Sequence, residues 1–287
     1  MSGFTGAPLE IVSGNGTAAV RLVDSHCHLQ VIAERGGAGS VEAALEEAAA
    51  AGVEQIVCPG LNAEDSDRCR EIAEAHAGVF FTVGWHPHER LAPDSAQIRV
   101  LDELLGHARA VGVGEVGLDQ YWRPGYHDTP LEVQQAALHQ MLELARSHDM
   151  PAGIHDRESH AEVLAAVDAV PGVRGVMHCF SGDVAHARLC RERGFLVSFA
   201  GNVTFPKNLA IQEAAREVDD LGYLVETDSP FLTPVPHRGR SNCPAYVAFT
   251  ALAVARLRGA DAAAVAQSTT ANARRLFSLR PEDRLGG

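Results

Sequence analysis

The residues that most clearly suggest chemistry are His26 and His28, which stand at the end of a short apolar run that starts at Leu22. Side chains at positions i and i+2 of a strand point to the same face, so the two imidazoles can converge where the strand ends. A neutral imidazole is the commonest metal ligand in proteins. Since one His-x-His pair also occurs by chance in a turn, the metal interpretation depends on later segments.

Further residues with ligand chemistry stand at the ends of other apolar runs. They are His86, His88, Glu115, Asp119, His155, His178 and Asp228. Imidazoles and carboxylates side by side are the donors that a divalent metal centre needs. Any one of them alone could be a hydrogen-bonded residue at a strand end. Their repetition at five strand ends favours a metal site.

The elements that would carry these residues alternate regularly along the chain. Eight apolar runs alternate with longer Ala-rich and Leu-rich segments of helical pattern, and the runs span residues 21–27, 53–59, 79–85, 111–118, 151–155, 175–179, 195–200 and 223–226. This alternation predicts parallel strands with crossover helices, and eight units fit a closed α/β (β/α)₈ TIM barrel, whose active sites lie at the carboxyl ends of the strands. The competing open, doubly wound sheet would show a Gly-rich phosphate turn after the first strand, and the sequence has none.

The rest of the chain predicts one domain. Residues 1–20 look like a flexible leader, residues 21–280 form the barrel domain and residues 281–287 a short tail. The start lacks the pattern of a signal peptide, and no apolar run approaches the roughly 18 residues of a membrane span. The six cysteines show no CxxC spacing, which is typical of buried thiols in a reducing cytoplasm. We therefore expect a cytoplasmic protein without a membrane contact, and nothing indicates an obligate protein partner.

Two histidines of the predicted helices, His160 and His186, get a plainer interpretation. Like the other histidines on helical patterns, they are expected to be solvated or to lie at helix ends. Near the end of the chain, Asn272, Leu276 and Phe277 are expected to seal the exterior of the barrel. These residues are therefore predicted to have structural roles only.

The net charge of −13 argues against a broad electrostatic contact with nucleic acid. It does not exclude a site that binds one or two phosphates through metal ions. The charge therefore limits the size of a nucleic-acid contact, not the chemistry of the site.

The bridging group of a two-metal centre can be chosen from the sequence. Two metals about 3.5–4 Å apart need a shared anion, and many two-metal barrels use a carboxylated lysine for this purpose. The single lysine, Lys207, lies in a loop after the seventh run and is in the wrong place. Glu115, in a Gly-rich context at the fourth strand, is the natural bridging carboxylate.

The remaining residues then divide between the two metals. His26, His28 and Asp228 are assigned to one metal and His155 and His178 to the other, with Glu115 shared. Asp228 can also hold the attacking water and accept its proton, so Asp228 and Glu115 are the predicted catalytic residues.

Together these segments resemble the TatD family of metal-dependent hydrolases, the TatD deoxyribonucleases. The resemblance runs from Leu22 to about Leu279 and rests on Asp24-Ser25-His26-Cys27-His28-Leu29, Gly84 with His86-Pro87, Gly114-Glu115-Val116-Gly117-Leu118-Asp119, Ile154-His155 with Arg157, His178-Cys179-Phe180-Ser181-Gly182, Glu226-Thr227-Asp228-Ser229-Pro230, and the late loop Pro234 to Gly239 with Asn242 and Pro244. It implies a TIM barrel, a two-metal site with the six ligands named above, and a magnesium-dependent DNase with 3′→5′ exonuclease action.

The sequence departs from the family pattern at the rim. Asp156-Arg157-Glu158 replaces a more usual Ser-Arg-Asp stretch, and Gln120-Tyr121-Trp122 stands where two aromatic residues usually follow the aspartate. These departures concern the substrate more than the hydrolysis. The histidine-rich donors are also softer than Mg²⁺ prefers, so Zn²⁺ or Mn²⁺ are further candidates for the two expected divalent ions.

The first functional hypothesis is a phosphodiesterase that acts on DNA 3′ ends, with single strands preferred and RNA as a further candidate. Its predicted substrate-binding residues are His86, Arg157, Ser181, Arg238 and Asn242. Guanidinium groups suit phosphate oxygens, and Trp85 or Tyr121 could stack on a base or simply pack. The alternative is a small-molecule amidohydrolase or lactonase with the same metals, which the acidic charge favours. A catalytically silent binding scaffold is the third hypothesis.

Overall fold

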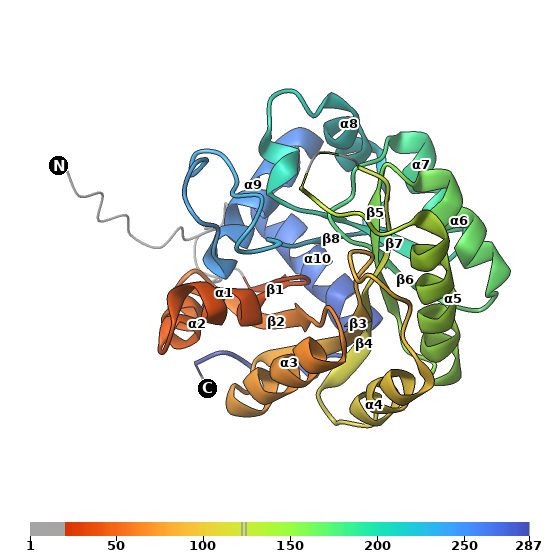
Figure 1. The fold of residues 1–287 in the computed structure, drawn as a ribbon. Coiled ribbons are helices and arrows are strands. Elements are labelled where there is room, and N and C mark those ends of the chain that lie inside the picture. The colour runs from red at the N-terminus through yellow and green to blue at the C-terminus, as the bar shows by residue number, and fades with distance from the viewer. Residues whose placement is uncertain (1–20, 122, 124, 287) are drawn as a thin grey trace.

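The computed structural model describes residues 21–121, 123 and 125–286, so the leader predicted at residues 1–20 lies outside them. Eight strands form one parallel sheet in sequence order, from β1 to β8 (Figure 1). Their bounds are β1 Leu22–Asp24, β2 Val53–Pro59, β3 Val79–Trp85, β4 Ala110–Asp119, β5 Ala152–Arg157, β6 Gly175–Met177, β7 Phe195–Phe199 and β8 Tyr223–Val225. Each falls within or overlaps one of the eight predicted runs.

The two ends of the sheet meet just beyond β1 and β8. Asp228 N donates to His26 O at 2.9 Å, and His28 N donates to Ser229 O at 2.8 Å. An isolated parallel bridge also joins Cys27 to Ser229. The sheet therefore closes into a TIM barrel, and the open, doubly wound alternative is excluded.

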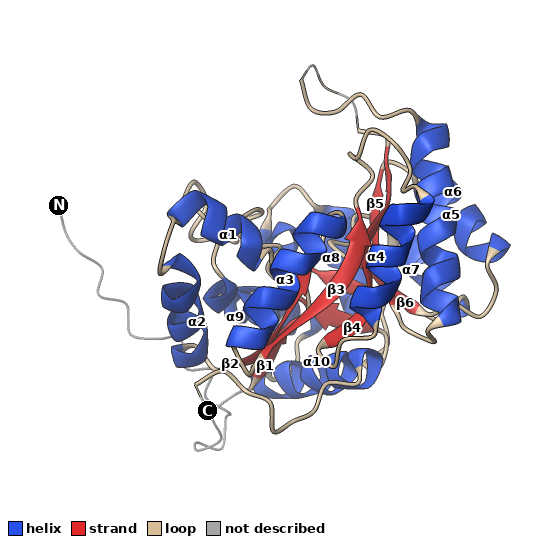
Figure 2. Ribbon diagram, turned by 60° about the horizontal axis from the view of Figure 1, so that its bottom comes forward, coloured by secondary structure: helices blue, strands red, loops and turns tan. Residues whose placement is uncertain are grey.

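Ten α-helices of the described chain surround the barrel (Figures 1 and 2). They are α1 Leu29–Gly36, α2 Ser40–Ala50, α3 Ala63–Ala75, α4 Ser95–Leu105, α5 Leu131–Ser147, α6 His160–Ala169, α7 Val184–Glu192, α8 Leu209–Glu217, α9 Val247–Arg258 and α10 Ala262–Phe277, with short 3₁₀ helices η1 Gly201–Thr204 and η2 Pro244–Tyr246. None of these described helices is both long and apolar enough to cross a membrane.

Side-chain caps fix where several helices begin. Asn62 accepts from Asp65 N ahead of α3, and Asp183 accepts from His186 N ahead of α7. Such caps satisfy backbone N–H groups that have no partner within the helix. Because each of these helices follows the carboxyl end of a strand, the caps also set the loops at that end of the barrel.

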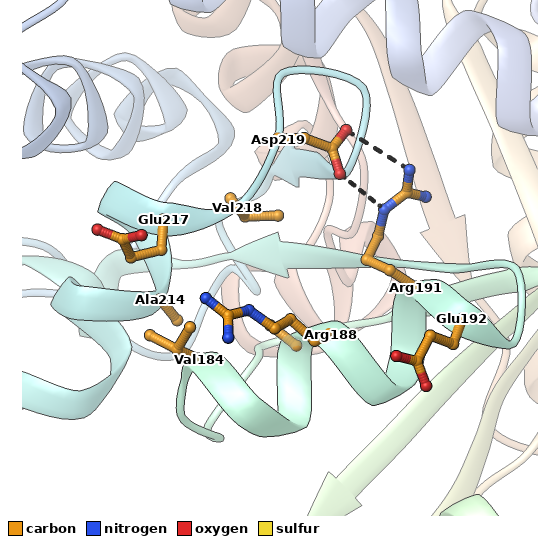
Figure 3. A pocket seen from close by; sticks show the side chains of 9 residues that line it. Val184, Arg188, Arg191, Glu192, Ala214, Glu217, Val218 and Asp219 are labelled. Carbon is orange, nitrogen blue, oxygen red and sulfur yellow. Dashed lines mark hydrogen bonds and ion pairs between the residues drawn. The ribbon is translucent and has the colours of Figure 1, made fainter.

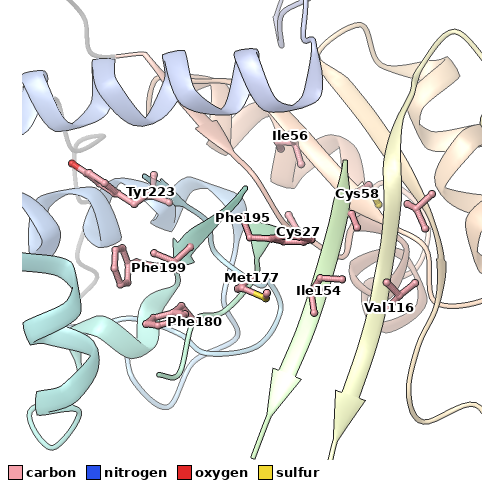
Figure 4. Close-up of a cluster of buried hydrophobic side chains, with 14 of the residues drawn as sticks. Cys27, Ile56, Cys58, Val116, Ile154, Met177, Phe180, Phe195, Phe199 and Tyr223 are labelled. Carbon is pink, nitrogen blue, oxygen red and sulfur yellow. The ribbon is translucent and has the colours of Figure 1, made fainter. Parts of the chain in front are cut away.

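Most of the buried apolar side chains form one layer between the strands and the helices. Figure 4 shows part of this layer, with Phe199 of β7 and Tyr223 of β8 near Phe180, and Phe195 of β7 beside Cys27. Each of these aromatic residues is at most 2% exposed. The layer holds the helices against the strands and so fixes the positions of the strand ends.

A second apolar cluster closes the barrel at the amino ends of its strands. It joins residues near the strand starts, such as Phe80 of β3 and Leu224 of β8, to Leu276 and Phe277 of α10. Side chains from opposite strands can meet in this way only inside the barrel, and Figure 2 shows α10 below the strands. Asn272 adds a hydrogen bond to the carbonyl of Tyr223 at 2.9 Å. The predicted structural role of this segment is therefore confirmed, but it closes the barrel's end rather than its exterior.

Candidate metal centre

The carboxylate of Glu115 lies between two pairs of histidines. Its Oε1 is 2.7 Å from His155 Nδ1 and 2.9 Å from His178 Nε2. Its Oε2 is 3.5 Å from Nε2 of both His26 and His28. Glu115 is only 3% exposed. Strand β4 thus places one buried carboxylate in contact with imidazoles that come from the ends of β1, β5 and β6.

Asp228 lies beside the pair of histidines that follows β1. Its Oδ1 is 3.3 Å from His28 Nε2 and 3.7 Å from His26 Nε2. Its φ of 55° is uncommon for a non-glycine residue, and its N–H bond to the carbonyl of His26 holds it there. The side chain of Asp228 is 13% exposed and that of Glu115 3%. Asp228 is therefore the carboxylate nearer to the opening of the centre.

Asp24 fixes the segment that carries Asp228. Its carboxylate accepts from Thr227 N at 2.9 Å and from Thr227 Oγ1 at 2.6 Å. Burial raises the pKa of Asp24 to about 8, although the hydrogen bonds from Thr227 oppose the shift. Asp24 thus ties the end of β1 to the loop after β8, where the barrel closes.

The charges of the centre are strongly coupled. Burial acts to raise the pKa of Glu115, but the facing charges of His178 and His86 outweigh it and hold that pKa well below its ordinary value. Burial acts to lower the pKa of His155, but hydrogen bonds with Asp119 and Glu115 raise it to about 8. Burial lowers the pKa of His86 to about 4. The centre therefore sets anionic carboxylates against a mixture of neutral and protonated imidazoles.

A glutamate and an aspartate orient two histidines of the centre, each by contacting the ring nitrogen that does not face Glu115. Glu226 Oε1 lies 3.4 Å from His178 Nδ1 and accepts from Cys179 N at 2.5 Å. Asp119 Oδ2 lies 3.2 Å from His155 Nε2, on the side of the ring away from Glu115. Such partners fix the orientation of an imidazole and leave its other nitrogen for a ligand. The sequence analysis gave Glu226 no role, although it is the last residue of the eighth run.

A smaller polar group adjoins the centre at Asp119. His88 Nε2 lies 2.9 Å from Asp119 Oδ2, His127 Nε2 lies 3.8 Å from Oδ1, and Tyr126 donates to Oδ2 at 3.2 Å. The sequence analysis missed His127 and Tyr126 because they lie in the loop after β4, with no periodic pattern. Their signal was only the cluster of polar and aromatic residues in that loop.

Three of the five predicted substrate-binding residues lie in or near the mouth of the barrel. Their side chains make few polar contacts within the protein. His86 Nε2 is 3.4 Å from Glu115 Oε1. Cζ of Arg157 lies 3.9 Å from the centroid of the Tyr121 ring, and its Nη1 donates to Tyr126 Oη at 2.6 Å. Ser181 Oγ donates to the carbonyl of Asp156 at 3.2 Å. Their contacts with substrate stay predictions.

The late loop holds the other two. Arg238 is exposed and lies over the ring of Phe205 at 3.8 Å. Asn242 is 3% exposed, and its Nδ2 donates to the carbonyls of Thr227 and Phe231 at 2.8 and 2.6 Å. These bonds give Asn242 a role in positioning the loop after β8, and its contact with substrate stays a prediction.

Trp85 packs rather than facing the mouth. Its side chain belongs to the layer between strands and helices, it is 5% exposed, and its Nε1 donates to the carbonyl of Leu91 at 2.9 Å. Trp85 is therefore a packing residue, which was the alternative to its stacking on a base. Tyr121, beside Arg157, is partly exposed and remains available to a substrate.

Because Gly84 has no side chain, the backbone of Glu115 can lie close to it. A Cβ at position 84 would lie 1.8 Å from Gly60 O and 2.5 Å from Glu115 N. Neither atom belongs to a flexible side chain, so no larger residue fits without a backbone shift. The glycine therefore lets β3 approach β4 closely at the level of the centre.

The donor atoms of the centre are close enough to share cations. One donor atom from each of His26, His28 and Asp228 lies within 4.8 Å of the other two, and the same holds for the group His86, Glu115 and His155 and for the group His26, His178 and Glu226. Nitrogen and carboxylate-oxygen donors at such spacing suit a divalent ion. All six residues predicted as ligands are brought together, and the structure therefore fits a buried metal centre.

A separate hollow lies between α7 and α8 (Figure 3). It encloses about 350 Å³ and is lined by residues such as Val184, Ala187 and Val218, with an ion pair between Arg191 and Asp219 at 3.2 Å. It contains none of the residues of the metal centre. The hollow is therefore not a candidate for the hydrolytic site.

Comparisons with known proteins agree with this geometry. A model of the family described as TatD related DNase matches residues 23–278. An uncharacterized metal-dependent hydrolase of Bacillus subtilis, YabD, is 34% identical over 90% of this chain and 99% of its own length. An uncharacterized metal-dependent hydrolase TatD of Mycobacterium tuberculosis is 38% identical over 90% and 98%. The crystal structure of YjjV, a TatD homologue of Escherichia coli, is 29% identical and superposes with a TM-score of 0.83 over 91% of this chain and 99% of that one.

Proposed function

The chain belongs to the TatD family of metal-dependent hydrolases, and we propose that it hydrolyses phosphodiester bonds at the 3′ ends of DNA, one nucleotide at a time. The description of the matching family names a DNase, which supports this choice of substrate. RNA ends are a second substrate of the same chemistry. The observation that carries the proposal is the position of Glu115, whose two carboxylate oxygens face different pairs of histidines.

The donors of the centre suit two divalent ions. His26, His28 and Asp228 would hold one, His155 and His178 the other, and Glu115 would be shared. The many imidazoles fit Zn²⁺ or Mn²⁺ as well as the Mg²⁺ expected from the family. When bound, the ions would supply a Lewis acid for the phosphate and make a water molecule acidic enough to attack at neutral pH.

Asp228 is the residue of this centre that can move a proton. Its carboxylate is the more exposed of the two in the centre, and it is held in place through backbone bonds on both sides. Its pKa is lowered: burial alone would raise it, and contact with His28 outweighs burial. We assign it the role of general base that accepts the proton of the attacking water at Oδ1.

The rim would bind the DNA end through few groups. The guanidinium groups of Arg157 and Arg238 each lie over an aromatic ring, and these contacts would help to hold them where they would face a phosphate oxygen. His86 and Ser181 would donate further hydrogen bonds. The net charge of −13 leaves little attraction for a long polyanion, so binding would be confined to the strand end.

A small-molecule amidohydrolase or lactonase is the second candidate, and the acidic net charge favours it. Its reaction would use the same centre on a carbonyl carbon. Metal-reconstituted protein assayed on a 3′-labelled single strand, beside a panel of lactones and amides, separates the two. Turnover of a lactone or amide without release of mononucleotides would replace the proposal with this second function.

A further inference from the structure

A second group of ligand-type side chains lies on the other face of β5. Successive residues of a strand point to opposite faces, so Asp156 points away from the centre that His155 enters. Asp156 Oδ2 lies 2.9 Å from His160 Nδ1 and 3.2 Å from His186 Nε2. The thiol of Cys190 lies 3.6 Å from the same His186 nitrogen. Three elements, β5, α6 and α7, thus bring these side chains together outside the barrel.

The spacing of the donor atoms suits one small cation. One donor from each of Asp156, His160 and His186 lies within 4.8 Å of the other two. Ligand atoms around a tetrahedral zinc ion with bonds of 2.0–2.3 Å are about 3.3–3.8 Å apart. His186 and Cys190 are four residues apart on α7, so both point from one helix face. The separations among Asp156, His160 and His186 therefore suit three ligands of one ion, and the Cys190 thiol, which is near His186, would have to turn toward the other two to become the fourth.

The group is buried, and its own hydrogen bonds do not satisfy all of its polar atoms. The side chain of Asp156 is 5% exposed and that of His186 8%. Oδ1 of Asp156 is buried without a hydrogen-bond partner among the residues that the structure describes. A buried carboxylate oxygen without a partner is costly, because it has lost its water and gained nothing in return. Coordination of a cation would satisfy it.

The arrangement of the two rings suits neutral imidazoles that bind one cation better than it suits two protonated imidazolium ions. The rings of His160 and His186 are stacked, with centroids 4.2 Å apart and planes at 23°. Two positive rings at this distance would repel each other across a single carboxylate. Two neutral rings that share one metal ion avoid this repulsion, since the charge then lies on the ion.

The surroundings hold the ring of His186 in place before any ion binds. Phe180 is parallel to it within 7°, at a centroid distance of 5.6 Å. A Cβ at Gly182 would lie 2.5 Å from His186 Cδ2, so the ring fits only because residue 182 is glycine. A donor that is fixed in this way loses little freedom on binding.

We propose that Asp156, His160, His186 and Cys190 bind a structural zinc ion between β5, α6 and α7. Nitrogen, thiolate and carboxylate donors together select zinc over magnesium. On binding, the Cys190 thiol loses its proton to solvent and a sulfur–zinc bond forms. The ion would join two helices to the strand that carries His155 and Arg157.

Cobalt substitution tests the site separately from the hydrolytic centre. Metal-free protein is titrated with Co²⁺ and its absorption spectrum recorded, because a cobalt–thiolate bond gives an intense near-ultraviolet charge-transfer band that imidazole and carboxylate ligands do not give. We expect this band in the wild type, in Asp228→Asn and in Cys58→Ser, whose buried thiol is a matched control. We expect its loss in Cys190→Ser and His186→Gln.

Zinc content gives the second readout. After equilibration with zinc and removal of excess, wild type should retain one equivalent per chain more than His186→Gln, as measured by mass spectrometry. His160→Ala, whose ring is 37% exposed, replaces His186→Gln if circular dichroism shows that the latter is unfolded. If the variant loses one equivalent of zinc but the wild type shows no cobalt–thiolate band, the site is supported and Cys190 is not one of its ligands. Equal zinc content in wild type and variant would overturn the proposal.

Discussion

Nδ1 of His155 lies 2.7 Å from Oε1 of Glu115, and Nε2 of the same ring lies 3.2 Å from Asp119. One imidazole therefore contacts carboxylates through both of its nitrogens. In the absence of a cation, this arrangement is satisfied when both nitrogens carry protons. A metal ion that binds at Nδ1 must take the place of one of them.

Metal binding should therefore be coupled to proton release. The pKa of His155 is raised to about 8, so the ring of the ion-free protein is largely protonated at pH 7 and neutral well above pH 8. The apparent affinity for divalent ions should rise with pH, by about tenfold per unit for each proton displaced, and level off above pH 8. Calorimetric titrations in two buffers of different ionisation enthalpy measure the protons released. A binding enthalpy that does not depend on the buffer at pH 7 would contradict this coupling.

Asp228→Asn should abolish most turnover while the fold is retained. The amide has the shape of the carboxylate but cannot accept a proton, so we expect kcat to fall by at least about 100-fold. Steady-state assays together with circular dichroism and thermal melting measure the two effects. Near-wild-type turnover in the folded variant would remove the role of general base from Asp228.

Gly84→Ala should destabilise the protein and damage the centre together. The added methyl group would lie 2.5 Å from the backbone nitrogen of Glu115, so the two strands must separate. We expect a loss of about 1–3 kcal/mol in the free energy of unfolding, as is usual for an overfilled core, and a loss of metal affinity. Urea unfolding and metal titration measure both.

Gly153→Ala is the matched control for that substitution. Gly153 also lies in a barrel strand, but a Cβ there would meet nothing nearer than the Cα of Gly114 at 3.9 Å. It should therefore be tolerated better than Gly84→Ala in both measurements. If the two variants lose equal stability and equal metal affinity, the close approach at Gly84 is not what positions Glu115.

The barrel could be predicted from sequence because its signal is local. Each of the eight apolar runs is bounded by polar residues, and the alternation with helical patterns leaves few arrangements. The predicted ligands met for the same reason, since strand ends of a parallel barrel share one face. The first helix, α1, had no comparable signal and was not predicted.

The failures came from contacts between elements that are distant in the sequence. His186 was predicted to be solvated or at a helix end. It does lie in the first turn of α7, but the solvated alternative was wrong, because its side chain is 8% exposed and faces Asp156. Helical periodicity shows which residues share a face, but not what the face meets. Glu226 was overlooked similarly, since its contact with His178 depends on how closely β6 and β8 approach inside the barrel.

The last prediction concerns the substrate. If the proposed function holds, the protein should remove nucleotides singly from a free 3′ end and prefer unpaired ends, because a barrel mouth ringed by loops would admit a strand end more easily than a continuous duplex. With a net charge of −13, affinity must come from the metal ions and a few groups such as Arg157 and Arg238. The salt dependence should therefore be shallow, at roughly 0.7 units of log–log slope for each single-strand phosphate neutralised.

A time course on end-labelled single strands measures this, with Mg²⁺ and Mn²⁺ supplied separately and a circular single strand as the control without ends. We expect a ladder of products shortened from the 3′ end and an intact circle. Internal cuts on the circle would exclude exonuclease action while keeping phosphodiester hydrolysis. No cleavage of any strand with either ion, together with turnover of a lactone or amide, would show that the same centre acts on carbonyl substrates instead. Because the two reactions differ in their products, one set of assays decides between them.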